Sequence, residues 1–368
     1  MVMLMVVVGL ALLTAGAELL VRSASAIAAA VGISPLVVGL TVVAYGTSAP
    51  ELVVSVQSAL TGKPDLALGN VIGSNIFNVL FILGISALII PLKVAQKLVH
   101  FDVPLMIALS VLVMVIGYDG QIGKRDGLML TAGLLAYTIW AIVSSRRDQA
   151  AIKAEYEAEF GTKESGFSVG KSLLNVFLLI VGLGLLVYGS RLFVEGAIAI
   201  ARNFGISELV IGLTIVAAGT SLPEVATSII AAIRGERDIA VGNVVGSNLF
   251  NIMGVLGISS LVSPGGIAVS DSAYFLDMPV MVAVAAACMP IFFTGHLLAR
   301  WEGALFLLYY VLYTAMIVIS ARMPEYSSTF SKVLLMLAIP LTVLGLIASL
   351  VRHRRQNAAP AGSSGSRD

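Results

Sequence analysis

The chain has 368 residues, of which 58% are hydrophobic and only 12% are charged, and its mean hydropathy is +0.99. This composition excludes a soluble globular protein and is typical of a polytopic membrane protein. The net charge of +1 argues against a nucleic-acid partner, and the single cysteine, Cys288, excludes an internal disulfide framework or a cysteine metal site.

We predict an all-α membrane protein, because a span needs about 20 apolar residues and the chain offers eleven such runs. The first run has no preceding basic residue and continues past a weak cleavage-like site, so it is expected to be a retained span. The predicted spans are 2–30, 35–60, 66–91, 102–118, 127–145, 172–201, 207–233, 239–262, 274–294, 301–320 and 333–351.

Two polar segments separate or follow these runs. The segment 146–171 carries charges of both signs and is predicted to be a cytoplasmic linker rather than a short amphipathic helix. Residues 356–368 are rich in alanine, glycine and serine and are predicted to be a disordered tail.

The two halves of the chain are copies of each other. Residues 46–84 fall on 219–257 after a shift of 173, with 20 of 39 positions identical. The first half, 1–145, holds five spans and a repeat motif at 34–84, and the second, 172–320, holds five spans and its copy at 207–257. Five is odd, so the second copy is inverted in the membrane, an arrangement typical of secondary transporters. The run 333–351 is an additional eleventh span outside this pair.

A helix-breaking acidic motif lies within the second span and recurs within the seventh. It reads Gly-Thr-Ser-Ala-Pro-Glu at 46–51 and Gly-Thr-Ser-Leu-Pro-Glu at 219–224. Each glutamate, Glu51 or Glu224, is the only charge in its apolar run. Because proline lacks a backbone donor, Pro50 and Pro223 are expected to free the carbonyls of Gly46 and Gly219 at membrane depth.

The predicted site is built from oxygen donors. Ser74 and Asn78 share one face of the third span, and Ser247 and Asn251 share the same face of the eighth. Carboxylate, carbonyl and hydroxyl oxygens suit hard cations such as Ca²⁺, and the lack of nearby imidazole or thiolate argues against zinc and copper. Two buried carboxylates carry a charge of about −2, which one Ca²⁺, two Na⁺ or two protons would neutralise.

Other charged residues are expected to have structural roles. Asp102 and Asp277 are expected to be helix caps before a first-turn proline. Glu18 with Arg22, and Arg191 with Glu195, are expected to form neutralising pairs along one helix face. Basic residues outside the spans favour one side by fourteen to six, which predicts an external N-terminus and a cytoplasmic C-terminus.

The repeated motifs, Gly46-Thr47-Ser48 with Pro50-Glu51 and Gly73-Ser74-Asn75 with Asn78, resemble the α-repeats of the Ca²⁺/cation antiporter superfamily, specifically its sodium/calcium exchangers. The resemblance implies ten helices in two inverted halves, with long first and sixth helices that slide to alternate access. It implies ions bound by the carboxylates of Glu51 and Glu224, the backbone carbonyls of Thr47 and Thr220, and flanking and central groups from Ser48, Ser74, Ser221, Ser247, Ala44, Ala217, Asn78 and Asn251.

The expected function is therefore a non-enzymatic Na⁺/Ca²⁺ antiporter of the cell (inner) membrane, with Ca²⁺ and Na⁺ as transported ions, no cofactor, the lipid bilayer as surroundings and no obligate protein partner. Some exchangers have aspartate where Asn251 stands, so no K⁺ co-transport is expected. A Ca²⁺/H⁺ antiporter on the same fold remains an alternative, since the same carboxylates bind protons. A cation channel is the alternative of another class.

Overall fold

The computed structural model describes residues 2–160, 169–205, 211, 214–215, 217–293 and 295–322. The predicted eleventh span 333–351 and the predicted tail 356–368 lie outside the described residues, as do parts of the linker and of the seventh span. Within the described ranges the protein is almost entirely helical, and eight helices there are long and apolar enough to cross a membrane. The bent pair Pro35–Leu60 adds a ninth candidate span. The prediction of an all-α polytopic membrane protein is confirmed.

The elements are helices, π-helical turns (η) and four short strands. The first half contains α1 (Val2–Val31), α2 (Pro35–Val38), η1 (Gly39–Val43), α3 (Ala44–Thr47), α4 (Ala49–Leu60), α5 (Pro64–Phe77), η2 (Asn78–Leu83), α6 (Gly84–Ile89), β1 (Leu92–Lys93), η3 (Leu98–Asp102), α7 (Val103–Ile116), β2 (Gln121–Ile122) and α8 (Lys124–Phe160). The second contains α9 (Val169–Asn203), α11 (Ala217–Gly219), α12 (Leu222–Ile233), α13 (Arg237–Phe250), η5 (Asn251–Leu256), α14 (Gly257–Val262), β3 (Ile267–Ala268), η6 (Ala273–Asp277), α15 (Met278–Phe293), β4 (Leu297–Leu298) and α16 (Arg300–Arg322).

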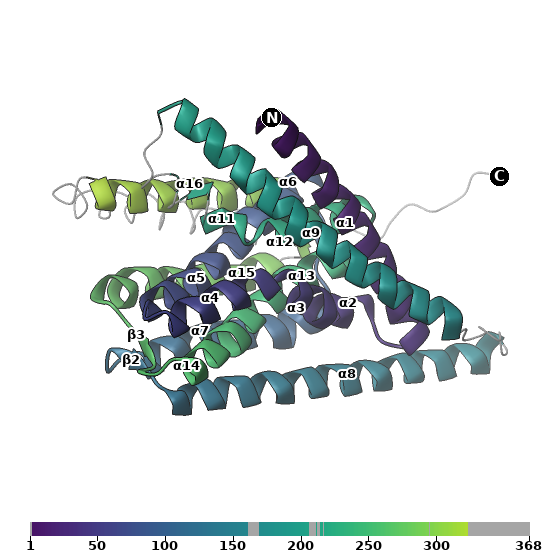
Figure 1. Cartoon of the computed structure of the whole chain (residues 1–368). Coiled ribbons are helices and arrows are strands. Elements are labelled where there is room, and N and C mark those ends of the chain that lie inside the picture. Colours follow the sequence, from purple (N-terminus) through teal and green to yellow (C-terminus); the bar gives the residue numbers. More distant parts are fainter. Residues whose placement is uncertain are drawn as a thin grey trace, which may run out of the picture.

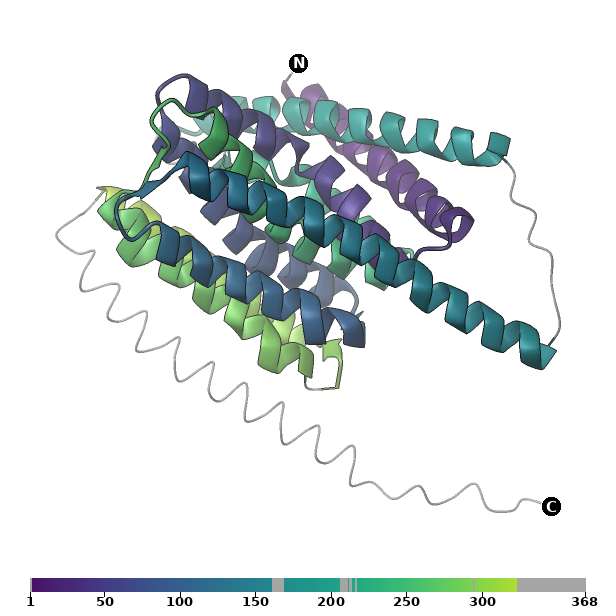
Figure 2. The same cartoon turned by 90° about the horizontal axis from the view of Figure 1, so that it is seen from below.

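The fifth span is longer than predicted. Its helix α8 continues to Phe160, so the segment after residue 145 begins as helix and the prediction of a non-helical linker is wrong over 146–160. In the view from below, the C-terminal end of α8 extends beyond the rest of the bundle (Figure 2). Alanine and glutamate predominate between residues 150 and 160, and both favour helix even without packing partners.

The sequence repeat reappears as a structural repeat. The helices α4 and α12 have the same bounds after the shift of 173, and so do the segments 64–89 and 237–262, including their π turns. Two antiparallel strand pairs join the halves, with β1 paired to β4 and β2 paired to β3. Each pair therefore takes one strand from each half.

The centre of the molecule consists of the third and eighth spans. Their apolar windows are 72% and 100% buried, whereas those of the other long helices are 22–39% buried. The long helices α1 and α9 pack side by side across the bundle (Figure 1). Gly16 and Gly182 lie at their crossing, where a Cβ on either would lie within 3 Å of the partner's backbone. Small residues allow this close approach of two helices in a membrane.

Two aspartates predicted to cap helices have a different role. Asp102 has helical dihedral angles (φ −72°, ψ −38°) and makes no capping hydrogen bond, whereas a cap residue needs non-helical angles. Instead, Tyr137 donates its hydroxyl to Asp102 at 2.9 Å, and Tyr313 donates to Asp277 at 3.0 Å. These bonds tie the fourth span to α8 and the ninth to α16.

The Tyr137 hydroxyl is expected to contribute measurably to stability. Asp102 is 2% exposed, and among the described residues its second oxygen has no donor. Y137F is expected to lower the free energy of unfolding by about 1–3 kcal/mol, because a buried acceptor loses its donor. Y313F is the matched control and should cost less, because Asp277 is partly exposed and water can replace the hydroxyl. Thermal unfolding in detergent micelles measures both, and equal losses would contradict the interpretation.

The predicted ion pairs differ between the two halves. Glu18 pairs with Arg22 as expected, but it also pairs with Arg234 at the end of α12, where Arg234 Nε donates to Oε2 at 2.8 Å. Glu18 therefore ties α1 to α12. Arg191 and Glu195, both described, form no ion pair with each other, so the prediction of a second neutralising pair is wrong.

Candidate functional site

Both copies of the acidic motif break their helix as predicted. The second span bends by 46° between Pro35–Thr47 and Ala49–Leu60. Ser48 lies at the break with φ −84° and ψ 8°, and Ser221 occupies the equivalent position with φ −90° and ψ 8°. The glutamates follow in the first turns of α4 and α12, where a helix N-terminus favours negative charge.

The carbonyls near the breaks have different partners. The carbonyl of Gly219 accepts a hydrogen bond from the hydroxyl of Ser190 on α9 at 2.7 Å, as expected of an oxygen that Pro223 leaves without a helical donor. The carbonyl of Ala44 accepts from the Ser48 amide at 3.0 Å and from the Thr47 hydroxyl at 3.3 Å. It is therefore engaged in bonds within its own helix. Ala217 lies at the start of α11.

The two acidic side chains lie between the repeats and are bonded across them. Ser48 donates to Glu224 Oε1 at 2.7 Å, and Ser221 donates to Glu51 Oε1 at 2.8 Å. Both glutamates are 1% exposed. The Oε2 atom of each has no hydrogen-bond donor among the residues that the structure describes.

The predicted serines and asparagines of the central spans border the same region. Asn78 begins η2, which packs against α12, and Asn251 begins η5, which packs against α4. The Oδ1 atoms of both are buried and lack a donor within the described ranges, and so does Ser247 Oγ. Ser74 accepts from Ser221 at 3.3 Å. Single π turns are common at functional sites, because they turn a side chain out of helical register.

The structure thus brings the hydroxyls of Ser48, Ser221 and Ser74 together with the two carboxylates. Within the described part of the chain there is no cluster of three or more histidine, cysteine, aspartate or glutamate side chains, so the candidate site depends on neutral oxygens as well as on the two acids. Unpaired carboxylate and amide oxygens, with no amine or guanidinium bonded to them, are suited to a cation.

Two asparagines that were not predicted as site residues support the broken helices. Asn70 donates to the backbone carbonyl of Glu51 at 3.3 Å and to Ser55 at 2.9 Å. Asn243 does the same for Glu224 and Ser228, at 3.4 and 2.9 Å, and its Oδ1 accepts from Thr47 at 3.2 Å. Both are identical at the repeat offset, which is the signal that could have identified them.

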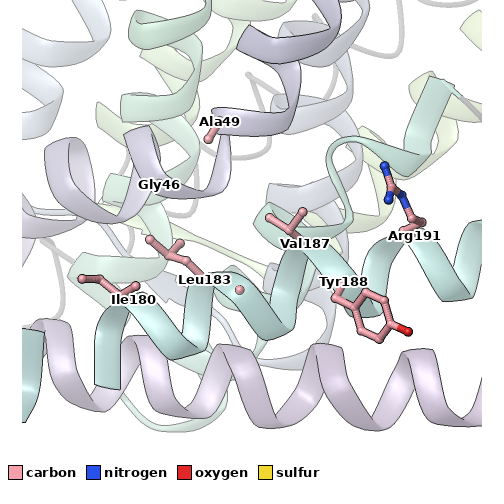
Figure 3. A pocket seen from close by; sticks show the side chains of 8 residues that line it. Gly46, Ala49, Ile180, Leu183, Val187, Tyr188 and Arg191 are labelled. Atoms are coloured by element: carbon pink, nitrogen blue, oxygen red, sulfur yellow. The ribbon is translucent and has the colours of Figure 1, made fainter. Parts of the chain in front are cut away.

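A cavity lies beside the break of the second span. It has a volume of about 530 Å³ and is lined by Gly46 and Ala49 and by Leu183, Val187 and Arg191 of α9 (Figure 3). A second cavity of about 480 Å³ continues to Gly219 and Thr220. The helix α1 packs directly against α12. The two halves are therefore similar in helix bounds but differ in packing, with open space next to α9 and close contact next to α1.

Comparisons with known proteins agree on one family. The family profile described as sodium/calcium exchanger protein matches residues 1–143 and 174–319. The inner membrane protein YrbG of Escherichia coli strain K12 is 39% identical over 284 residues, covering 76% of this chain and 85% of YrbG. Sodium/calcium exchanger MaX1 of Methanosarcina acetivorans is 31% identical over 337 residues, covering 84% and 96%.

The fold is also similar to solved structures. The sodium-calcium exchanger NCX_Mj, soaked with 10 mM Na⁺ and zero Ca²⁺, superposes with a TM-score of 0.71 at 31% identity. The match covers 88% of this chain and 100% of that one. It extends over both repeats.

Proposed function

Because this chain belongs to the sodium/calcium exchanger protein family, and is thus a multi-pass membrane antiporter rather than an enzyme, we propose that it exchanges Na⁺ for Ca²⁺ by alternating access to one shared site. The observation that carries the proposal is the pair of buried carboxylates, Glu51 and Glu224, each with one oxygen bonded across the repeats and one oxygen without a donor.

The ligand roles are proposed as the resemblance of the repeated motifs implies them. Glu51 and Glu224 bind either Ca²⁺ or Na⁺, and the amide oxygens of Asn78 and Asn251 lie at the centre. The remaining oxygens complete the coordination; they come from Thr47, Thr220, Ser48, Ser221, Ser74, Ser247, Ala44 and Ala217. Ca²⁺ takes six to eight oxygens, and its charge cancels that of the two carboxylates. Na⁺ ions neutralise the same charge and use the hydroxyl and carbonyl oxygens.

The packing difference between the halves supports alternating access. Residues 1–145 and 172–320 would act as two inverted repeats around the site, joined by the segment 146–171. In the present arrangement two cavities lie next to α9, whereas α1 contacts α12, and Glu51 and Glu224 line neither cavity. A shift of the α1–α9 pair along the bundle would exchange the two conditions.

We place the protein in the cell (inner) membrane with its N-terminus outside and its C-terminus in the cytoplasm. The similarity to an inner membrane protein supports the location, and the excess of basic residues in the predicted cytoplasmic segments supports the orientation. The bilayer is the expected environment, with no cofactor and no obligate protein partner.

A Ca²⁺/H⁺ antiporter is the second candidate, because two buried carboxylates can release one Ca²⁺ by binding two protons. The neutral oxygens around Glu51 and Glu224 favour Na⁺, since a proton needs only the carboxylates. A cation channel is less compatible with a site whose two acids are 1% exposed.

Ca²⁺ uptake into proteoliposomes is the measurement that tests the proposal. Vesicles loaded with Na⁺ and diluted into Na⁺-free medium are expected to accumulate radiolabelled Ca²⁺, because outward Na⁺ movement drives Ca²⁺ inward. Vesicles loaded with choline at the same pH are the control and should accumulate little. Uptake that ignores the Na⁺ gradient but follows a pH gradient would refute the Na⁺ proposal, and single-channel currents would support a channel.

A further inference from the structure

The amide orientation of Asn78 and Asn251 decides whether these side chains attract or repel a cation. The oxygen and the nitrogen end of an asparagine side chain have nearly the same shape but opposite polarity. Both residues are 1% exposed, so water cannot correct an unfavourable orientation. In the structure the oxygen end of each is the one without a donor.

The nitrogen ends are held by two further asparagines. Asn78 Nδ2 donates to Asn248 Oδ1 at 3.1 Å, and Asn251 Nδ2 donates to Asn75 Oδ1 at 3.1 Å. Both bonds connect the third span with the eighth. If Asn75 or Asn248 turned its amide over, it would present N–H₂ to N–H₂, and its neighbour would have to turn as well.

Asn75 and Asn248 cannot turn over, because atoms that only accept hydrogen bonds face their nitrogen ends. Asn75 Nδ2 faces the backbone carbonyl of Asn248 at 3.5 Å and the sulfur of Met281 at 3.7 Å. Asn248 Nδ2 faces the backbone carbonyl of Asn75 at 3.4 Å and the sulfur of Met106 at 3.3 Å. These contacts are long and individually weak. A turned amide, however, would place its oxygen against a carbonyl and a thioether, neither of which can donate.

We propose that Asn75 and Asn248, backed by Met281 and Met106, are positioning residues that hold the amide oxygens of Asn251 and Asn78 toward the transported ion. This inference rests on the proposed function of the site. The two methionines belong to the fourth and ninth spans, so these spans act on the ion through the asparagines without touching it. All four polar members are buried, at 1–3% exposure.

The test is a double-mutant cycle with N75L and N251D, because a carboxylate presents oxygen at both ends and needs no orientation. The measurement is the Ca²⁺ concentration that half-saturates the site, obtained by fitting the rise in melting temperature of purified protein in detergent against Ca²⁺ concentration. N75L is expected to raise this concentration about tenfold in the chain with Asn251. In the N251D background, N75L is expected to change it less than about twofold.

M281L tests the same positioning role if N75L does not fold, because leucine and methionine have similar volumes and the core packing is kept. It is expected to raise the Ca²⁺ midpoint about two- to threefold in the chain with Asn251 and to leave it unchanged in the N251D background. The effect is smaller than that of N75L, because the contact of Asn75 with the Met281 sulfur is weaker than its hydrogen bond to Asn251. A purely structural role of Asn75 would instead give the same loss in both backgrounds. That result, or unchanged Ca²⁺ midpoints in N75L and M281L, would overturn the inference.

Failure of the inference can be distinguished from failure of the proposed function. If the wild-type protein shows no stabilisation by Ca²⁺, or stabilisation that Na⁺ does not reduce, then the shared site itself is wrong. If the wild-type protein binds both ions competitively and the cycle is additive, only the positioning role is wrong.

Discussion

E51Q is expected to abolish Na⁺-dependent Ca²⁺ uptake. Glutamine keeps the shape and the hydrogen bond from Ser221 but removes one of the two buried charges, so a bound Ca²⁺ would retain about one uncompensated charge in a buried site. Leaving a buried charge without its partner costs about 3–5 kcal/mol, which corresponds to roughly a hundredfold or greater loss of Ca²⁺ affinity. Radiolabelled Ca²⁺ uptake into Na⁺-loaded proteoliposomes measures the effect.

Controls separate this loss from misfolding. E224Q is expected to behave like E51Q, because the repeat places the two acids equivalently. E236Q, which changes a glutamate in the short turn between α12 and α13, should transport normally. Without ions, E51Q should melt no lower than the wild-type protein, because a neutral amide costs less to bury than a carboxylate. Wild-type transport by E51Q would remove Glu51 from the site.

G246V is expected to destabilise the protein severely. A Cβ at position 246 would meet the backbone of Leu40, with the Leu40 Cα only 2.6 Å away, because α13 packs directly on η1. A backbone atom cannot move aside as a flexible side chain can, so the two helices must separate. We expect a loss of about 3 kcal/mol and a clearly lower yield of folded protein in fluorescence-detected size-exclusion chromatography.

G184V is the control for this prediction. Gly184 lies on α9 and is exposed, and no atom of the described residues lies within 4 Å of where its Cβ would be. G184V is therefore expected to fold with a melting temperature close to that of the wild-type protein. Equal destabilisation by G184V and G246V would show that the contact with Leu40 is not the cause of the loss.

Sequence reasoning predicted the parts of the fold that depend on local pattern. Apolar run length predicted the spans, and the shift of 173 predicted helix bounds that agree residue for residue between 49–60 and 222–233. The breaks at Ser48 and Ser221 followed from a proline two residues later. Each of these features depends on neighbours in the chain, so a single sequence contains the necessary information.

Side-chain partners far apart in the chain were not predictable in the same way. An aspartate before a first-turn proline is typical of a helix cap, but Asp102 bonds to Tyr137, which is 35 positions away. Met106 and Met281 resemble ordinary core residues until their sulfurs are seen against the amides of Asn248 and Asn75. The spacing of Glu18 and Arg22, one helical turn, predicts a single ion pair, and nothing in the sequence indicates the second bond of Glu18 to Arg234.

The repeated acidic motif separates what the sequence determines from what only the tertiary structure determines. The sequence alone establishes two broken helices, each with one carboxylate and the same hydroxyls, because proline, charge and apolar context act locally. The folded chain adds that Ser48 bonds to Glu224 and Ser221 to Glu51, so that each half completes the other's site. No local pattern encodes these bonds, because their partners are 176 and 170 positions apart in the chain.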